Sequence, residues 1–266
     1  IETFSGLKIG YFIDTHRSML KRKIIANCFD FVFVAQKIAV HQFERTHNVA
    51  WLPLAYNDKY KSQNNNKKYE VSFIGNTNHK GSSRGKDVDQ ILKAFHHPKT
   101  NGYHFIDMLK TYGESKIVLN NTIGGELNMR FFEGIGSGAV LLTDQEDNCI
   151  GDLFTPGEDF VKFTGPEDAI RKVHMILSDY KAYSLKAKKA QAKVLKLHTY
   201  KKRLMEIVKK SQNVCPKTIR GFNVGLFYFA MNNLKEFSSN TVLLKTYRYT
   251  LTFINKFRKL RSFFFQ

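Results

Sequence analysis

The chain has 266 residues, of which 42% are hydrophobic and 14% aromatic, so its composition excludes an intrinsically disordered protein. Its three cysteines lie far apart and form no CxxC pair, which argues against a disulfide framework or a cysteine metal site and favours a reducing cytoplasm. The net charge of +19 is concentrated at one end, because residues 181–266 hold 20 of the 42 lysines and arginines and only 2 of the 23 acidic residues. A neutral body with a basic appendage is unlike a uniformly basic nucleic-acid-binding domain.

The first part of the chain alternates between strand and helix patterns. Strands are predicted at residues 7–13, 29–35 and 49–54, with helices at 18–28 and 37–46 between them. This alternation predicts a parallel sheet with right-handed crossovers. A complete doubly wound unit has about five or six strands, so we expect that the first strands of this unit are absent from the chain.

A polar stretch at residues 57–68 indicates an interdomain linker, after which the alternation restarts. Strands are predicted at 69–74, 116–119, 139–143 and 160–163, and helices at 88–95, 104–112, 129–135, from Pro166 onward, at 181–197 and at 200–210. The sequence therefore predicts an α/β protein with one unit at 1–58, a second at 59–211 and a basic tail at 212–266.

The stretch SKIVLNNTIGGELNMRFFEGIGSGAVLLT at residues 115–143 carries the clearest chemistry. It predicts a strand, a glycine loop and the N-terminus of a helix, whose N–H groups and partial positive charge suit a phosphate. Gly124 and Gly125 would let the backbone approach a ligand closely, and Asn128 would cap the helix. Arg130 adds a positive charge, and Glu133 could accept two ribose hydroxyls. An ordinary capped helix with Glu133 facing solvent explains the same residues.

Several motifs together resemble the CgeB-like (spore-protein) glycosyltransferase family, a branch of the retaining family 4-type enzymes, over residues 7–210. The resemblance implies a GT-B fold with Rossmann-like parallel sheets, comprising a complete C-terminal nucleotide-binding domain and part of the N-terminal, acceptor-side domain. The matching segments are IDTH at 13–16, FDFVFVAQK at 29–37, NVAWLPLAYND at 48–58, VSFIGNTNHKGSSR at 71–84, SKIVLN at 115–120, NMRFFEGIGSGAVLLT at 128–143, LFTPGEDFVKF at 153–163 and HTYKKR at 198–203.

The resemblance assigns roles to residues of the second unit. Glu133 matches the second glutamate of the family's E-x7-E pattern, which holds the ribose of the donor. The first glutamate would fall at Gly125, so either the neighbouring Glu126 or the backbone of 124–128 would have to contact the sugar. Lys80 and Arg84 match positions placed against the pyrophosphate, with Lys86 as a third candidate. Solvated basic side chains in a loop are the alternative.

The family also places a histidine of its first domain near the donor sugar, a role that falls to His16, with Asp14 orienting its ring. The alternative is a turn in which both residues cap the following helix. Asp87 and Asp89 have D-x-D spacing, but their place at the start of a helix favours capping, so no metal site and no cofactor are expected.

The resemblance implies metal-independent transfer of a sugar from a nucleotide-sugar to an unknown glycan, lipid or protein acceptor, with retention of configuration. One alternative is a non-catalytic protein of a surface or coat layer that keeps the fold. Another is nucleic-acid binding through the basic end, although no motif of a nucleic-acid-binding fold supports it. Residues 242–261 have a basic face and an apolar face, which predicts a helix lying on an anionic membrane from the cytoplasmic side. Packing of this helix on the protein body is the alternative.

Overall fold

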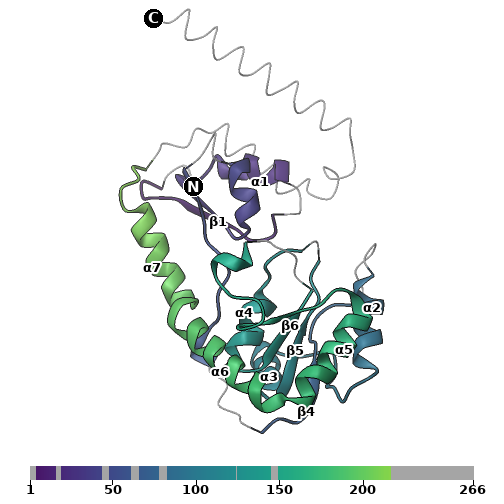
Figure 1. Cartoon of the computed structure of the whole chain (residues 1–266). Coiled ribbons are helices and arrows are strands. Elements are labelled where there is room, and N and C mark those ends of the chain that lie inside the picture. The colour runs from purple at the N-terminus through teal and green to yellow at the C-terminus, as the bar shows by residue number, and fades with distance from the viewer. Residues whose placement is uncertain are drawn as a thin grey trace, which may run out of the picture.

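The computed structural model describes residues 4–15, 19–43, 48–60, 66–77, 83–123, 125–144 and 149–216, and they form two parallel sheets (Figure 1). The first has the order β1 (Ile9–Phe12), β2 (Phe31–Val34) and β3 (Asn48–Trp51). The second has the order β4 (Tyr69–Ser72), β5 (Ser115–Asn120), β6 (Val140–Thr143) and β7 (Val161–Lys162). Every neighbouring pair is parallel, so the predicted α/β fold is confirmed.

The connections of the first unit are short. They contain α1 (Met19–Ala26) and the 3-10 helices η1 (Lys37–Gln42) and η2 (Asp58–Tyr60). The prediction of a helix over 37–46 was wrong in type, because η1 is a 3-10 helix of six residues. Its N-cap residue Gln36 makes no side-chain capping bond, since its amide is bonded to Leu127 of the second unit. Without a cap, and with Ala39 as its one buried residue, this segment lacks what stabilises a longer α-helix.

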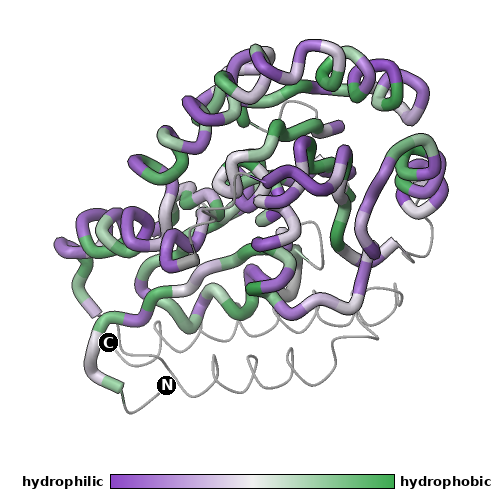
Figure 2. Tube along the Cα trace, turned by 90° about the horizontal axis from the view of Figure 1, so that it is seen from below, coloured by the Kyte–Doolittle hydropathy of each residue, from purple (hydrophilic) through white to green (hydrophobic). Residues whose placement is uncertain are grey.

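Helices cover both faces of the second sheet (Figure 1). Side chains of α3 (Phe105–Gly113), α4 (Met129–Gly136) and α6 (Tyr180–Leu197) form one apolar cluster with Val118 and Leu141 of the strands. Side chains of α2 (Arg84–Leu92) and α5 (Gly165–Ser178) form the other, on Ile117 and Leu142. Figure 2 shows hydrophilic and hydrophobic residues alternating along the helices, as expected of elements buried on one side.

Helix α4 packs closely on its sheet because of a glycine. A Cβ atom at Gly134 would lie 2.7 Å from Leu141 Cδ1 and 3.1 Å from Val118 Cγ1. Contacts this short are excluded for real side chains, so any larger residue would push α4 away from β5 and β6. The N-terminus of α4 is thereby held at a fixed height above the ends of these strands.

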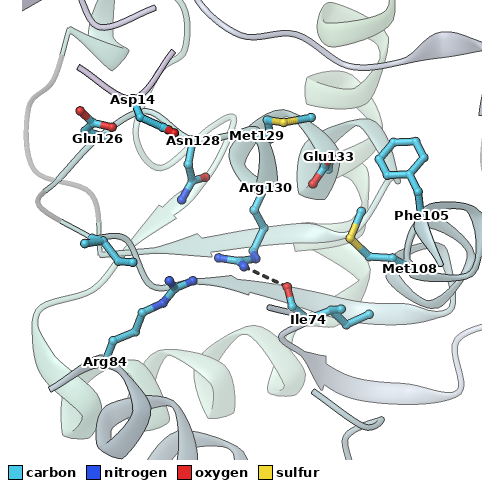
Figure 3. Close-up of a pocket in the computed structure, with 11 residues that line it drawn as sticks. Asp14, Ile74, Arg84, Phe105, Met108, Glu126, Asn128, Met129, Arg130 and Glu133 are labelled. Atoms are coloured by element: carbon cyan, nitrogen blue, oxygen red, sulfur yellow. Dashed lines mark hydrogen bonds between the residues drawn. The ribbon is translucent and has the colours of Figure 1, made fainter. Parts of the chain in front are cut away.

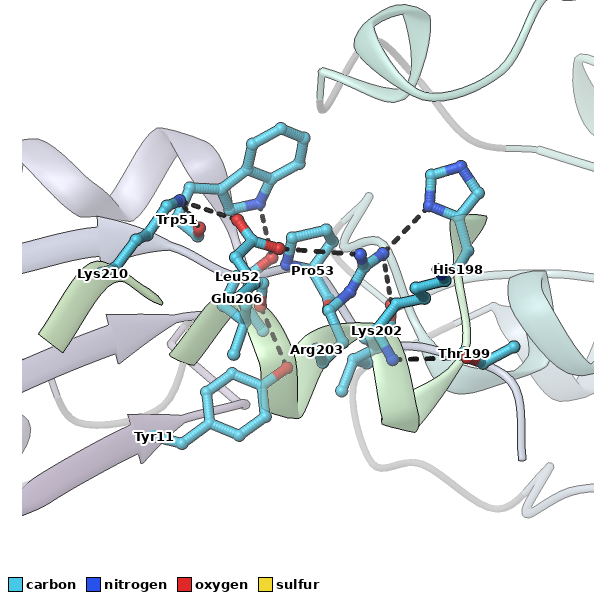
Figure 4. Close-up of polar contacts among 12 residues, drawn as sticks. Tyr11, Trp51, Leu52, Pro53, His198, Thr199, Lys202, Arg203, Glu206 and Lys210 are labelled. Carbon is cyan, nitrogen blue, oxygen red and sulfur yellow. Dashed lines mark hydrogen bonds and ion pairs between the residues drawn. The ribbon is translucent and has the colours of Figure 1, made fainter. Parts of the chain in front are cut away.

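The last described helix, α7 (Tyr200–Ser211), returns to the first unit (Figure 1). Ile207 packs on the cluster of Phe31, Phe33 and Leu52, and Arg203 Nε donates to Pro53 O at 2.8 Å (Figure 4). The boundary predicted at residue 211 therefore groups α7 by sequence with the second unit, whereas its contacts are with the first sheet.

His198 lies at the junction of α6 and α7, where the sequence predicted a structural residue fixing the last helix. Its Nδ1 accepts a hydrogen bond from Arg203 Nη2 at 3.0 Å, and its carbonyl accepts one from Tyr56 N at 2.9 Å. Burial first, then the charge of Arg203, lowers the pKa of His198 to about 4. The ring is therefore neutral at pH 7, and it joins α7 to the segment that leaves the first sheet.

Residues 217–266 lie outside the described part of the chain. The basic tail beyond Pro216 and the membrane-binding helix at 242–261 therefore stay predictions. Within the described ranges, no helix combines the length and the apolar character needed to cross a bilayer.

Candidate functional site

A cavity of about 440 Å³ opens where strands β4 and β5 end and α4 begins (Figure 3). Both units line it, because Asp14 follows β1 of the first sheet and the other residues belong to the second unit. Ligands of parallel α/β sheets bind beyond the carboxyl ends of the strands. The lining residues are Asp14, Ile74, Arg84, Phe105, Met108, Ile123, Glu126, Asn128, Met129, Arg130 and Glu133.

The N-terminus of α4 faces this cavity and is firmly anchored. Asn128 is its N-cap, and its Oδ1 accepts a hydrogen bond from Phe131 N at 3.1 Å. The side-chain amide of Asn128 also donates to Asn120 Oδ1 at 2.9 Å, which connects the cap to the end of β5. The partial positive charge of a helix N-terminus attracts anions, so this end of α4 is suited to a phosphate.

The glycine loop before α4 is only partly described. Gly124 lies outside the described residues, and Gly125 has a φ of +68°. A Cβ atom at Gly125 would have nothing within 4 Å, so its left-handed backbone, rather than a close neighbour in the chain, accounts for the glycine.

Arg130 provides a guanidinium that is held rigidly but keeps its charge. It donates from Nη2 to Ile74 O at 2.9 Å, from Nε to Tyr112 Oη at 3.3 Å and from Nη1 to Asn120 Oδ1 at 3.3 Å. All three acceptors are uncharged, and Arg130 forms no ion pair with an acidic residue in the described ranges. A positive charge fixed in this way at a cavity favours an anionic ligand.

A second guanidinium lies close to the first. Arg84, at the start of α2, is buried with its Cζ 5.1 Å from the ring centre of Phe73, and Arg130 Cζ lies 4.3 Å from the same centre. Burial, followed by the charge of Arg130, lowers the pKa of Arg84 to about 10, so both remain charged at pH 7. Two cations beside one cavity repel each other, and an anion bound there would relieve the repulsion.

Glu133 lies one turn further along α4 and also lines the cavity. Its side chain is buried, at 6% exposure for the residue, which disagrees with the alternative of a solvent-facing glutamate. Burial raises its pKa to about 7, against the opposing effect of Arg130. Within the described part of the chain, its carboxylate accepts no hydrogen bond. A buried acceptor of this kind is suited to ligand hydroxyl groups.

The remaining predicted residues are divided between described and undescribed parts. His16 and Lys80 lie outside the described residues, so their roles stay predictions, as does that of Gly124. Lys86 is described but exposed, and it does not line the cavity. Asp87 accepts a hydrogen bond from Ser83 Oγ at 2.7 Å in the first turn of α2, and no cluster of metal-ligating side chains occurs in the described ranges.

The sequence analysis missed part of the site. Phe105 and Met108 line one end of the cavity from α3, and Ile74 lies beside them (Figure 3). They carry no polar signal, and α3 looked like an ordinary amphipathic helix. Asn120 could have been noticed, because it is a polar residue at the end of a buried strand and within one of the matching motifs.

Comparisons with known proteins agree with this geometry. The profile of a family described as glycosyl transferase-like matches residues 64–209. No curated protein matches the chain.

Two solved structures share the fold at low sequence identity. Anabaena HepE, solved with UDP and glucose, is 12% identical, with a TM-score of 0.61 over 77% of this chain and 71% of that one. The pneumococcal O-GlcNAc transferase GtfA, solved with UDP and GlcNAc, is also 12% identical, with a TM-score of 0.53 over 73% of this chain and 47% of that one. At this identity they show the fold alone, which is that of GT-B glycosyltransferases.

Proposed function

The chain belongs to the glycosyl transferase-like family and is a glycosyltransferase, and from this premise we propose that it uses a nucleotide-sugar donor and retains the configuration of the transferred sugar. We further propose that it falls in the CgeB-like branch, on the motifs quoted above. HepE and GtfA were both solved with UDP and a sugar, which supports a nucleotide-sugar as the class of donor.

The order of groups along the cavity carries this proposal. Arg84, Arg130 and the N-terminus of α4 form a cationic part, and Glu133 lies one turn beyond them (Figure 3). A nucleoside diphosphate has the same order of chemistry, since its pyrophosphate needs cations and helix N–H groups and its adjacent ribose offers two hydroxyl donors. Charge and hydrogen-bonding chemistry therefore fit in sequence along one ligand.

The apolar end then accommodates the base. Phe105 and Met108 lie beyond Glu133 as seen from Arg84 (Figure 3). An aromatic ring and a thioether offer polarisable surface to a flat heterocycle. The base would therefore lie against α3, with its identity set by groups that these apolar side chains do not supply.

The donor sugar would occupy the opposite end, near the first unit. Asp14 and Glu126 line the cavity there, and Thr15 Oγ1 donates to Glu126 Oε1 at 3.4 Å (Figure 3). Glu126 is the neighbour of the position at which the E-x7-E pattern has its first glutamate. We propose that Glu126 takes over the contact with the sugar and that His16, next to Thr15, lies beside it.

Transfer would proceed on one face of the sugar. The bond between the anomeric carbon and the phosphate oxygen breaks, and its electron pair stays on the diphosphate. The acceptor oxygen bonds to the same face and gives its proton to a phosphate oxygen. Arg84, Arg130, Lys80 and the N-terminus of α4 stabilise the charge on the departing diphosphate, and each such contact contributes about 2–4 kcal/mol. The residues of the cavity otherwise position the reactants.

Calorimetry with UDP, GDP and ADP, each with and without EDTA, tests the donor site. We expect one nucleotide to bind with an affinity that chelation changes less than tenfold, because no metal ligands are expected at the site. Turnover of the matching nucleotide-sugars, with NMR detection of the anomeric configuration of the product, tests retention. Absence of binding by all three nucleotides would refute the proposed donor class.

We also propose a cytoplasmic protein whose tail at 242–261 binds an anionic membrane. Support comes from the sequence, in which basic and apolar residues of this segment separate onto two faces at helical spacing. Co-sedimentation with phosphatidylcholine vesicles and with vesicles containing phosphatidylserine tests it. Binding should need the anionic lipid and should be lost on truncation after residue 221. Equal sedimentation with both vesicles would contradict it.

A further inference from the structure

The backbone of the loop that leads into α4 is held by a side chain from the other unit. Gln36 follows β2, the central strand of the first sheet, and its residue is 2% exposed. Its Nε2 donates to Leu127 O at 3.0 Å, and its Oε1 accepts from Leu127 N at 3.0 Å. Leu127 is also buried and immediately precedes the N-cap Asn128.

This pair of bonds fixes the loop in two respects. One hydrogen bond would fix a distance and leave the peptide free to rotate, whereas a planar amide bonded to both the N–H and the C=O of one residue also fixes its orientation. The next residue is the cap that aligns the first turn of α4, and Arg130 and Glu133 follow within two turns. Shifts of about 1 Å in groups that contact a reacting ligand are costly.

The neighbouring contact between the two units provides a comparison. Lys37 Nζ lies 2.6 Å from Asp152 Oδ2, and both side chains are about half exposed, at 46% each. This ion pair joins the same two units one residue further along the chain, but on the protein surface and away from the α4 loop. It is therefore expected to contribute little to the position of α4.

We propose that Gln36 is a positioning residue of the donor site, which places the first turn of α4 against the cavity although Gln36 itself does not line it. The first unit then forms part of the donor site through the backbone it holds as well as through Asp14. This inference rests on the proposed function, because the donor site is the site that Gln36 is said to position.

The test measures nucleotide affinity in the whole chain for Gln36→Met and for the matched control Lys37→Met. Gln36→Met keeps the length of the side chain and removes both hydrogen bonds. We expect its dissociation constant for the best-bound of UDP, GDP and ADP to rise about 10- to 50-fold, while Lys37→Met stays within twofold of the wild type. Amide exchange of the peptide covering residues 125–131 should become faster in Gln36→Met alone.

A second variant guards against misfolding of the first. In Gln36→Glu the ionised carboxylate accepts from Leu127 N but cannot donate to Leu127 O, whereas the protonated form can do both. Its affinity relative to the wild type at each pH should therefore recover as the pH falls from 8 to 5.5. A residue with a merely structural role would change the melting temperature without this pH-dependent recovery of affinity.

The possible outcomes separate the two proposals. If the wild type binds none of the three nucleotides, the proposed donor class fails and this inference fails with it. If the wild type binds one of them and Gln36→Met binds it equally well, the role of Gln36 alone is refuted. Equal weakening by Gln36→Met and Lys37→Met would also refute it, since any loosening of the two units would then suffice.

Discussion

The site at α4 and the junction at α7 each contain an arginine with three hydrogen bonds, yet the two regions differ in what surrounds the charge. Arg203 donates to Pro53 O, Leu54 O and His198 Nδ1, and Glu206 Oε2 lies 3.8 Å from its Nη1 (Figure 4). Arg130 also has three uncharged acceptors, but it has no acidic partner in the described ranges and faces a cavity (Figure 3). The number of hydrogen bonds therefore does not distinguish a structural arginine from a ligand-binding one, whereas the uncompensated charge beside a cavity does.

The titratable neighbours of these arginines differ in the same way. His198 is buried and its Nδ1 is occupied by Arg203, which leaves the ring neutral and committed to the junction. Glu133 is equally buried but has no hydrogen-bond donor among the described residues, and its carboxylate borders the cavity. Burial opposes ionisation in both, so a shifted pKa alone would not tell the structural residue from the one proposed to bind a ligand.

The largest expected effects come from exchanging each arginine for methionine. Arg203→Met should lower the free energy of unfolding by about 3 kcal/mol, because it leaves the buried carbonyls of Pro53 and Leu54 without their donor. Nucleotide affinity of the folded protein should stay within twofold. Urea unfolding and calorimetry measure the two quantities.

Arg130→Met should give the reverse result. Affinity for the nucleoside diphosphate should fall about 100-fold, since a charge-assisted contact with the pyrophosphate is lost. Stability should change by less than about 1 kcal/mol, because water in the cavity can replace the guanidinium at Ile74 O and repulsion of Arg84 is removed. A large loss of stability with unchanged affinity would assign Arg130 to the structural class.

The pH dependence of stability should differ in sign between the two regions. His198 has a folded-state pKa of about 4, below its ordinary 6.5, so its contribution to stability is complete above pH 6.5 and is lost as the pH falls through 4. Glu133 has a folded-state pKa of about 7, above its ordinary 4.5, so its contribution is present below pH 4.5 and is lost as the pH rises through 7. Each shift corresponds to up to about 3 kcal/mol.

The two opposing slopes overlap between pH 4.5 and 6.5 and should largely cancel in the wild type. Glu133→Gln removes one slope, so its free energy of unfolding should rise with pH over this window relative to the wild type. His198→Gln keeps an acceptor for Arg203 and should fall over the same window. Urea unfolding at several pH values measures both, and parallel curves for all three proteins would contradict the proposed burial of these two groups.

The sequence was sufficient for the order of elements and for the residues of α4. The capped N-terminus, Arg130 and Glu133 were predictable because the cap, the cation and the carboxylate lie within six residues, so a single helix fixes their relation. The parallel sheets were predictable because apolar strands alternate with amphipathic helices. These inferences depend on local spacing alone.

The contacts across the molecule could not be predicted in this way. Nothing in the spacing between Gln36 and Leu127 indicates that they are bonded, since the contact depends on how two units pack. The return of α7 to the first sheet has the same cause. The burial of Glu133 was also undetermined, because both a solvated and a buried glutamate fit the helical pattern, and the packing of neighbouring elements decides between them.

The smallest expected effect, and the most specific, concerns Glu133 and the ribose. At pH 8 the carboxylate is ionised, and Glu133→Gln should weaken the nucleoside diphosphate by about 1–3 kcal/mol, or about 5- to 150-fold, because charge-assisted hydrogen bonds are replaced by neutral ones. At pH 6 most of the wild-type carboxylate is protonated, given its pKa of about 7, so the difference between the two proteins should shrink.

A 2′,3′-dideoxy nucleotide provides the control, because it lacks both ribose hydroxyls. It should bind the wild type more weakly than the ordinary nucleotide does, and it should bind the wild type and Glu133→Gln almost equally at both pH values. The pH dependence excludes a simple loss of packing, since the shape of the side chain does not change with protonation. If the substitution weakens both nucleotides by the same factor, Glu133 does not contact the ribose, and the order of pyrophosphate, ribose and base along the cavity must be reassigned.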